Sequence, residues 1–154
     1  MDYDINDYVT SALGDLRASL ENLVREAEEI SGEHLRFVMT ENKRRAFGDQ
    51  STLYCKVRQT SNSLSVTWYK CQWYGVKPKR YLRKTTIPKP NRKHIYTMAS
   101  LESVARSWEI DMVRDIELKL AEIRRQSYHI GKALGTLNIM VSNHGKNAWQ
   151  QVSA

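Results

Sequence analysis

The sequence predicts an α+β fold in which two long amphipathic helices flank a central antiparallel β-meander of three to four strands. Two observations carry this prediction. Apolar residues recur with helical spacing at both ends of the chain, and β-branched and aromatic residues alternate with polar ones in the middle. With 154 residues, 41% of them hydrophobic, the chain suits a single domain with one modest core.

Residues 1–46 predict the helical N-terminal part of this domain, with a first helix over residues 3–30. Its apolar residues recur in alternating steps of four and three, which gives a heptad seam flanked by charged residues. A stripe this narrow needs a second helix to cover it, either from the same chain or across a homodimer. Ser31-Gly32 is expected to end this helix before a second helical piece that runs to about Ala46. The seam residues are Val9, Leu13, Leu16, Leu20, Leu23, Ala27 and Ile30.

Residues 51–97 predict the β-meander. Strands are expected over residues 52–58, 64–74 and 80–87, because these stretches are rich in Val, Thr, Tyr and Trp and are separated by polar or Gly- and Pro-containing turns. Residues 94–96 are a candidate for a short fourth strand.

Alternation along these strands predicts a half-buried sheet with a basic, aromatic outer face. Lys56 and Arg58 share the outer face of the first strand. Trp68 is expected in the core, together with one of Trp73 or Tyr74.

Residues 98–141 predict the C-terminal helix. Thr97 or Ser100 can cap it, and the acidic Glu102 suits the positive end of the helix dipole. Residues 142–154 are polar and are expected to form a flexible tail.

The charge of the chain is concentrated in the middle. Residues 1–33 hold 2 basic and 9 acidic residues, a net charge of −7, whereas residues 34–97 hold 15 basic and 2 acidic residues, a net charge of +13. A segregated basic block is typical of proteins that bind polyanions, and we expect DNA, most readily double-stranded DNA, as the partner. The candidate DNA-binding residues are Lys56, Arg58, Lys70, Lys77, Lys79, Arg80, Arg83, Lys84, Lys89, Arg92 and Lys93.

Aromatic residues lie among these cations. Trp73 and Tyr81 are candidates for stacking on exposed bases, since every base presents a π-face. The turns at residues 77–84 and 89–93 contain no acid, so their side chains repel one another and favour a partner that supplies the opposite charge.

The sequence offers no catalytic, metal or cofactor site. Its histidines lack the spacing of a metal-binding pair, and no Gly-rich phosphate loop is present. Asp111 and Asp115 lie one helical turn apart, which indicates a solvated face rather than a metal site. Cys55 and Cys71 lack the C-x-x-C spacing of a zinc site and are expected to be buried or half-buried strand residues.

The acidic N-terminus lacks the positive start and apolar stretch of a secretory signal, and no apolar run is long enough to span a bilayer. We therefore expect a cytoplasmic protein.

The chain resembles the MobI family of conjugative-transfer proteins, which occur in integrative conjugative elements and related large plasmids. The resemblance rests on the leucine-rich first helix, the runs Asn62–Tyr69 and Tyr81–Lys84, and Tyr96 ahead of a helix that bears Ala105 and Trp108-Glu109. It implies an auxiliary role at the transfer origin, where the protein binds DNA and helps a relaxase, and it implies no catalytic residues.

Other functions fit the same residues. A protein-interaction adaptor would dock an acidic partner on the basic sheet or the heptad helix, and a transcriptional regulator would bind DNA in the same way. A metal-dependent nuclease is a further alternative that requires a carboxylate site.

Overall fold

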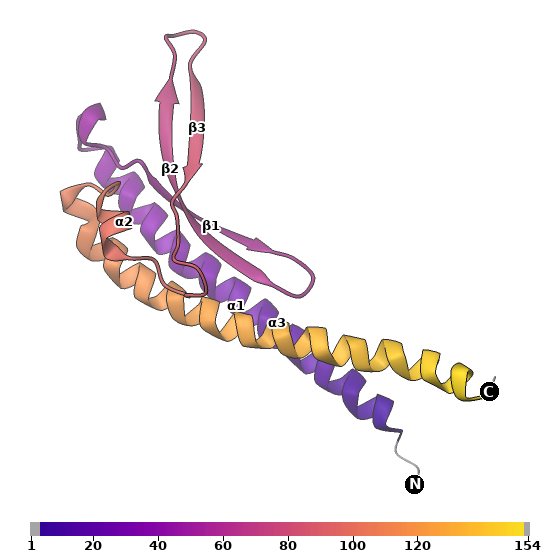
Figure 1. Cartoon of the computed structure of the whole chain (residues 1–154). Helices are drawn as coiled ribbons and strands as arrows, with labels where there is room; N and C mark the ends of the chain where they lie inside the picture. The colour runs from indigo at the N-terminus through magenta and orange to yellow at the C-terminus, as the bar shows by residue number, and fades with distance from the viewer. Residues whose placement is uncertain (1–3, 153–154) are drawn as a thin grey trace.

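A computed structural model describes the backbone of residues 4–152 and the side chains of residues 4–142. A long helix is followed by a three-stranded antiparallel sheet and a second long helix, which is the predicted α+β arrangement (Figure 1). The elements are α1 (Ile5–Asn42), the 3₁₀ helix η1 (Phe47–Asp49), β1 (Leu53–Gln59), β2 (Leu64–Tyr74), β3 (Tyr81–Thr86), α2 (Met98–Glu102), the 3₁₀ helix η2 (Ser107–Glu109) and α3 (Ile110–Val152).

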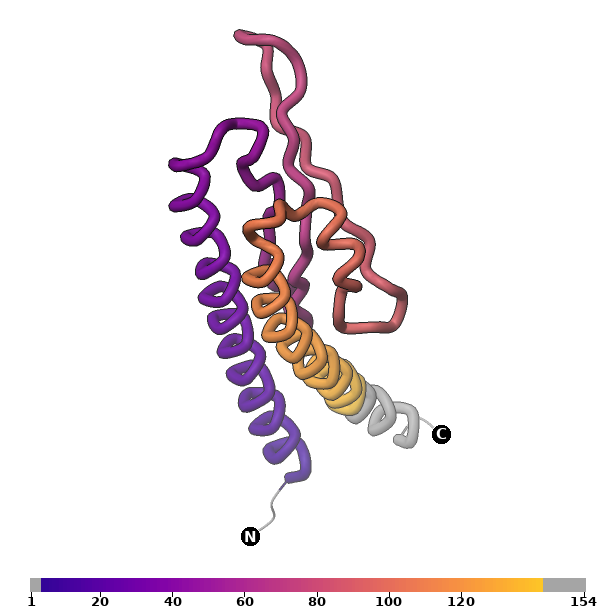
Figure 2. The backbone as a smooth tube through the Cα atoms, turned by 90° about the vertical axis from the view of Figure 1, so that its left-hand side faces the viewer, coloured from indigo at the N-terminus to yellow at the C-terminus, as the bar shows by residue number. Residues whose placement is uncertain are grey.

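The apolar seam of α1 packs against α3 of the same chain, and the two helices run side by side (Figures 1 and 2). The helix that covers the seam is therefore supplied within the chain. On the facing side, Val113, Ile116, Leu120, Ile123 and Leu134 of α3 are buried. The buried seam residues of α1 are Val9, Leu13, Leu20, Leu23, Ala27 and Ile30, with Leu16 partly buried beside them.

α1 is one continuous helix, so the predicted break at Ser31-Gly32 is wrong. The buried face continues from Ile30 to His34 and Val38 in steps of four, and His34 occupies the seam position where the sequence shows no apolar residue. Burial of His34 and Val38 offsets the cost of about 1 kcal/mol that a glycine imposes on a helix interior.

The strand β2 is shared by two hairpins. Its first half pairs with β1, from Gln59 opposite Leu64 to Leu53 opposite Lys70. Its second half pairs with β3, from Tyr69 opposite Thr86 to Tyr74 opposite Tyr81. The first hairpin lies against the helices, whereas the second projects away from them (Figures 1 and 2). The sheet thus has one packed half and one free half.

The packed half has the predicted faces. Leu53, Cys55, Leu64, Val66 and Trp68 are buried, and Lys56 and Arg58 are exposed. Residues 94–96 form no strand and belong to the connection between β3 and α2. The sheet has three strands because the edge of β2 next to this connection is bonded by side chains instead: the Trp68 N–H donates to the Tyr96 hydroxyl at 3.3 Å.

The C-terminal helix begins later than predicted. Thr97 caps only the short α2, its hydroxyl accepting from the Ser100 N–H, and the long α3 starts at Ile110 instead of residue 98. Between them the buried Glu109 accepts from the Arg106 N–H at 2.9 Å and from the Ser51 hydroxyl at 2.7 Å. These bonds turn the chain before α3. Beyond residue 142, where a tail was predicted, the backbone of α3 continues to Val152.

A buried polar cluster, here called the Glu117 network, fixes α3 against β2 and the β3–α2 connection. The Glu117 carboxylate accepts from the Trp68 indole at 2.7 Å and from the Tyr96 N–H at 2.8 Å. It also pairs with both terminal nitrogens of Arg124, at 2.7 and 3.1 Å. Arg124 in turn donates its Nε–H to the Val66 carbonyl at 2.9 Å. Every charge in the cluster has a partner, which is the condition for burying charge without a large penalty.

Candidate nucleic-acid interface

The second half of β2 and the whole of β3 form a projecting hairpin, residues 69–86, that we call the arm. Every residue of β3 is exposed, and β2 becomes exposed beyond Cys71. In the described part of the chain, neither long helix covers a face of the arm (Figures 1 and 2). The sequence contains no Asp or Glu between Asp49 and Glu102, so the arm carries cations alone.

The arm gathers six of the eleven candidate DNA-binding residues. Arg83 and Lys70 lie on one face of the ribbon, and Lys84 lies on the other. Lys84 sits over the ring of Tyr54, with its Nζ 4.9 Å from the ring centroid, and Tyr54 shares the outer face of β1 with Lys56 and Arg58. The cationic surface therefore continues from the arm onto β1. The six arm cations are Lys70, Lys77, Lys79, Arg80, Arg83 and Lys84.

The other three candidates lie elsewhere. Lys89, Arg92 and Lys93 belong to the connection between β3 and α2, which returns to the side of α3 away from the arm tip (Figure 2). Arg92 and Lys93 line a shallow depression on α3, and Lys89 lines a separate groove described below. The cations that were grouped by sequence thus lie on three surfaces: the arm with β1, the depression on α3, and the groove.

Both aromatic residues at the end of β2 are exposed, Trp73 by 50% and Tyr74 by 39%, so the prediction that one of them is in the core is wrong. The strand has left the helices by this point. Tyr74 stacks on the exposed Tyr81 across the ribbon, with centroids 6.0 Å apart, and Arg83 lies 6.0 Å from the Tyr74 ring. The two residues proposed for base stacking, Trp73 and Tyr81, lie on opposite faces.

Phe47 is an aromatic residue of this surface that sequence reasoning missed. It is 68% exposed, and the Arg80 guanidinium lies 5.3 Å from its ring and 4.7 Å from the Trp73 ring. The signal in the sequence is an isolated aromatic residue between two polar loops. Its sequence neighbours Arg44 and Arg45 both bond to Glu41, and these hydrogen bonds lower the pKa of the Glu41 carboxyl. Arg45 also pairs with Asp49, so two carboxylates already match the two cations.

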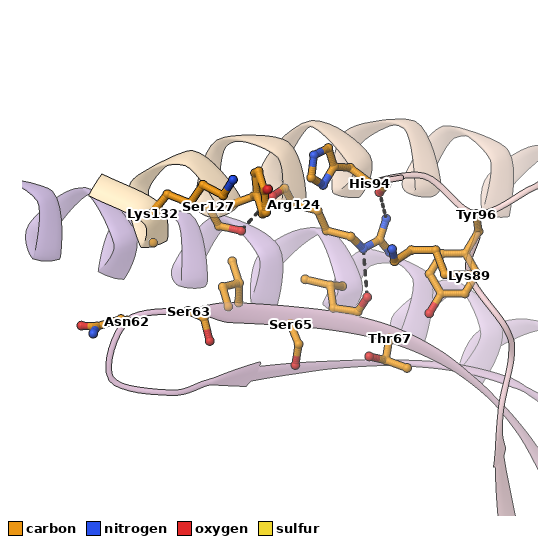
Figure 3. A pocket seen from close by; sticks show the side chains of 14 residues that line it. Asn62, Ser63, Ser65, Thr67, Lys89, His94, Tyr96, Arg124, Ser127 and Lys132 are labelled. Carbon is orange, nitrogen blue, oxygen red and sulfur yellow. Dashed lines mark hydrogen bonds between the residues drawn. The ribbon is translucent and has the colours of Figure 1, made fainter. Parts of the chain in front are cut away.

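A groove separates the first half of β2 from α3, and we call it the β2–α3 groove (Figure 3). Its volume is about 460 Å³. Arg124 spans it at one end, donating to the carbonyls of Val66 and His94. At the other end Gly131 allows the β1–β2 turn to approach α3, because a Cβ there would lie 2.8 Å from the Asn62 carbonyl oxygen. Lys89 and Lys132 line its sides.

The buried cluster of His34, Ser51 and Glu109 lacks the arrangement of a nucleophilic triad. The Ser51 hydroxyl donates to Glu109 at 2.7 Å, while the His34 Nε2 lies 3.6 Å from the same carboxylate. The serine hydroxyl is therefore bound by the carboxylate and not by the imidazole, which a nucleophilic triad would use as the base. His34 packs edge-on against the ring of Trp68 at 5.1 Å.

The cysteines lie where the sequence placed them: Cys55 is buried and Cys71 is half-buried. Burial raises the pKa of both thiols, that of Cys55 to about 12, so both are protonated at neutral pH. Within residues 4–142, no three His, Cys, Asp or Glu side chains come together as a metal site. None of the helices in the described part of the chain is both long and apolar enough to cross a membrane.

The fold and this surface define a class: a basic α+β protein in which a pair of long helices presents an acid-free cationic β-hairpin. The family model for the MobI protein matches residues 23–138, which is most of the chain. The chain belongs to the MobI family, and it is a protein related to conjugative mobilisation. No curated protein and no solved structure matches it.

Proposed function

We propose that this protein is a DNA-binding accessory factor for conjugative transfer, which binds the transfer origin and assists a relaxase without a catalytic site of its own. The observation that carries the proposal is the arm, which projects six cations and exposed aromatic rings with no acid among them. Family membership supplies the biological process.

The dimensions of the arm suit duplex DNA. Its paired strands are six residues long, which corresponds to about 20 Å at the usual rise of a β-strand. The major groove, about 12 Å wide, accommodates a two-stranded ribbon. Arg and Lys on both faces would then meet phosphates on the two sides of the groove, and Trp73 and Tyr81 would contact bases.

The proposal is tested by fluorescence anisotropy on two labelled duplexes across a salt series. One duplex carries intergenic DNA from around the gene of this protein, and the other carries a shuffled sequence. If about six cations meet phosphates, affinity falls by roughly a thousandfold between 50 and 200 mM salt. The triple substitution Arg80→Ala, Arg83→Ala, Lys84→Ala is expected to weaken binding by at least about tenfold and to reduce the salt dependence.

A matched control removes three cations from α1: Arg17→Ala, Arg25→Ala, Arg36→Ala. It changes the net charge equally and is expected to leave the affinity within about twofold, since charges beyond a Debye length of about 10 Å are screened. Equal losses in both variants would reduce the effect to net charge alone. Adding the relaxase and measuring nicking then separates a transfer factor from a transcriptional regulator, which would leave nicking unchanged.

A homodimer is part of the proposal and would use other residues than the heptad seam, because α3 already covers that seam. Leu35 and Met39, exposed on α1 by 42% and 56%, are the apolar residues available on that helix near its C-terminal end. Light scattering of the purified protein, with Leu35→Lys and Met39→Lys as the variant, measures this: the double substitution is expected to yield a monomer.

A further inference from the structure

The edge of β2 that faces the β2–α3 groove is not paired with another strand. In an antiparallel pair, alternate residues direct both backbone groups toward the partner strand and the others direct them away. The Trp68 N–H and C=O and the Val66 C=O bond to Tyr96, Ile87 and Arg124, so they point away from β1. By the same alternation, the N–H and C=O of Leu64 and the N–H of Val66 point into the groove.

These groups form a short template for a further strand. The open edge runs from Leu64 to the N–H of Val66, three residues or about 10 Å, because the Arg124 guanidinium already occupies the Val66 carbonyl. Beyond it the Ile87 N–H donates to the Trp68 carbonyl at 3.0 Å, where the β3 side of the sheet begins. Toward Ser63 the groove is bounded by the Asn62 carbonyl, which lies against Gly131 of α3, and Figure 3 shows the groove between this turn and Arg124. An added strand would therefore be short, and it would enter from the open side of the groove.

The walls of the groove are cationic. Arg124 is matched by Glu117, but Lys89 and Lys132 have no carboxylate partner among the ion pairs of the described residues. Lys132 lies with its Nζ 4.7 Å from the ring centroid of Tyr128, which is itself 46% exposed. None of the residues that line the groove is acidic.

We propose that the β2–α3 groove binds an extended, acidic peptide segment of a partner protein, which adds as a strand to the edge of β2 beside Lys89 and Lys132. The open backbone groups favour a peptide over a phosphate backbone: Leu64 offers a donor and an acceptor, as a paired strand requires, whereas a phosphate can only accept. Main-chain pairing supplies affinity in this mode of recognition, and flanking side chains supply specificity. The partner meets the protein on a surface apart from the arm, so DNA and peptide can bind together.

The probe for this site is a fluorescein-labelled octapeptide of alternating Glu and Val with blocked ends, followed by anisotropy. The wild-type protein is expected to bind it at least about tenfold more tightly than the matched peptide of Lys and Val. The double substitution Lys89→Glu, Lys132→Glu is expected to reverse that preference. The arm variant Lys77→Glu, Lys79→Glu makes the same change in net charge and is expected to keep peptide affinity within about twofold.

A second probe tests the pairing itself. Two further acidic peptides are made, one N-methylated at the odd-numbered residues and the other at the even-numbered ones. Each keeps the charge of the parent but loses the N–H donors of one strand edge, and at least one of the two is expected to lose binding. The proposal is overturned if the acidic peptide does not bind at millimolar concentration, or if both methylated peptides bind as well as the parent. It is also overturned if duplex DNA displaces the peptide through Lys89 and Lys132. If the arm variant loses DNA binding and keeps peptide binding, the two sites are separate, and a failure of one proposal can be told from a failure of the other.

Discussion

The two halves of β2 show how one strand serves two purposes. Trp68 is fully buried, and its indole N–H donates to Glu117. Trp73, five residues further along the same strand, is half exposed, and the Arg80 guanidinium lies 4.7 Å from its ring. In the first half, charge and aromatic surface are matched within the molecule. In the second half the charged and aromatic side chains are exposed and available to a partner. The difference shows that β2 leaves the core at about Cys71.

The comparison is tested most strongly by truncating the two tryptophans. Trp68→Ala is expected to lower the free energy of unfolding by about 3–5 kcal/mol, because it empties a core site and removes a donor from Glu117. Trp73→Ala is expected to change it by at most about 0.5 kcal/mol. Urea denaturation followed by circular dichroism measures both. A loss of similar size at Trp73 would mean that the arm packs on the core; Trp68→Phe is the milder variant if Trp68→Ala fails to fold.

A somewhat smaller effect is expected at Glu117. Glu117→Gln keeps the shape of the side chain but leaves the buried Arg124 without a counter-charge, and we expect a loss of about 3 kcal/mol in the free energy of unfolding. The control is Glu122→Gln on the same helix, whose partner Arg125 is exposed. Its denaturation midpoint is expected to stay close to that of the wild type. Equal midpoints for the two variants would contradict the structural role of the network.

The smallest effect is measured without any substitution, by comparing how fast the thiols of Cys55 and Cys71 react. Burial raises the pKa of Cys55 to about 12, and Cys55 is inside the packed half, whereas Cys71 is half-buried at the base of the arm. At pH 8 Ellman's reagent is expected to react with Cys71 faster than with Cys55, because Cys71 is more exposed and the Cys55 thiol is almost entirely protonated. Because the pKa of Cys55 is above this range, its rate should rise about tenfold per pH unit from 8 to 10. Equal rates would show that the packed half opens readily.

The sequence predicts the strands well and the helix boundaries less well. Alternation of Val, Thr and Trp sets the bounds of β2, which the structure matches at both ends. The predicted helix break at Ser31-Gly32 was wrong because His34 continues the buried face of α1. A search for regularly spaced apolar residues does not find a buried histidine. The late start of α3 depends on bonds from Glu109 to Ser51 and Arg106, which join residues that are distant in sequence.

The candidate site was predicted in composition and not in shape. The cations of the arm are evident from charge alone, but nothing local distinguishes Arg83, on the arm, from Lys89, in the groove. Glu117 and Arg124 are seven residues apart on a helix rich in charge, and their burial depends on Trp68 and Tyr96 reaching them from other elements. The β2–α3 groove likewise arises from tertiary packing.

The pairing of α1 with α3 has a consequence for biosynthesis. α1 is made before α3, which covers it, and the 67 residues from 43 to 109 must be made between them. At about 5–20 residues per second, the apolar seam of a nascent chain stays uncovered for roughly 3–13 seconds. The net charge of −7 over residues 1–33 surrounds that seam. Because like charges repel, this acidic segment opposes the association of two uncovered seams before α3 is made.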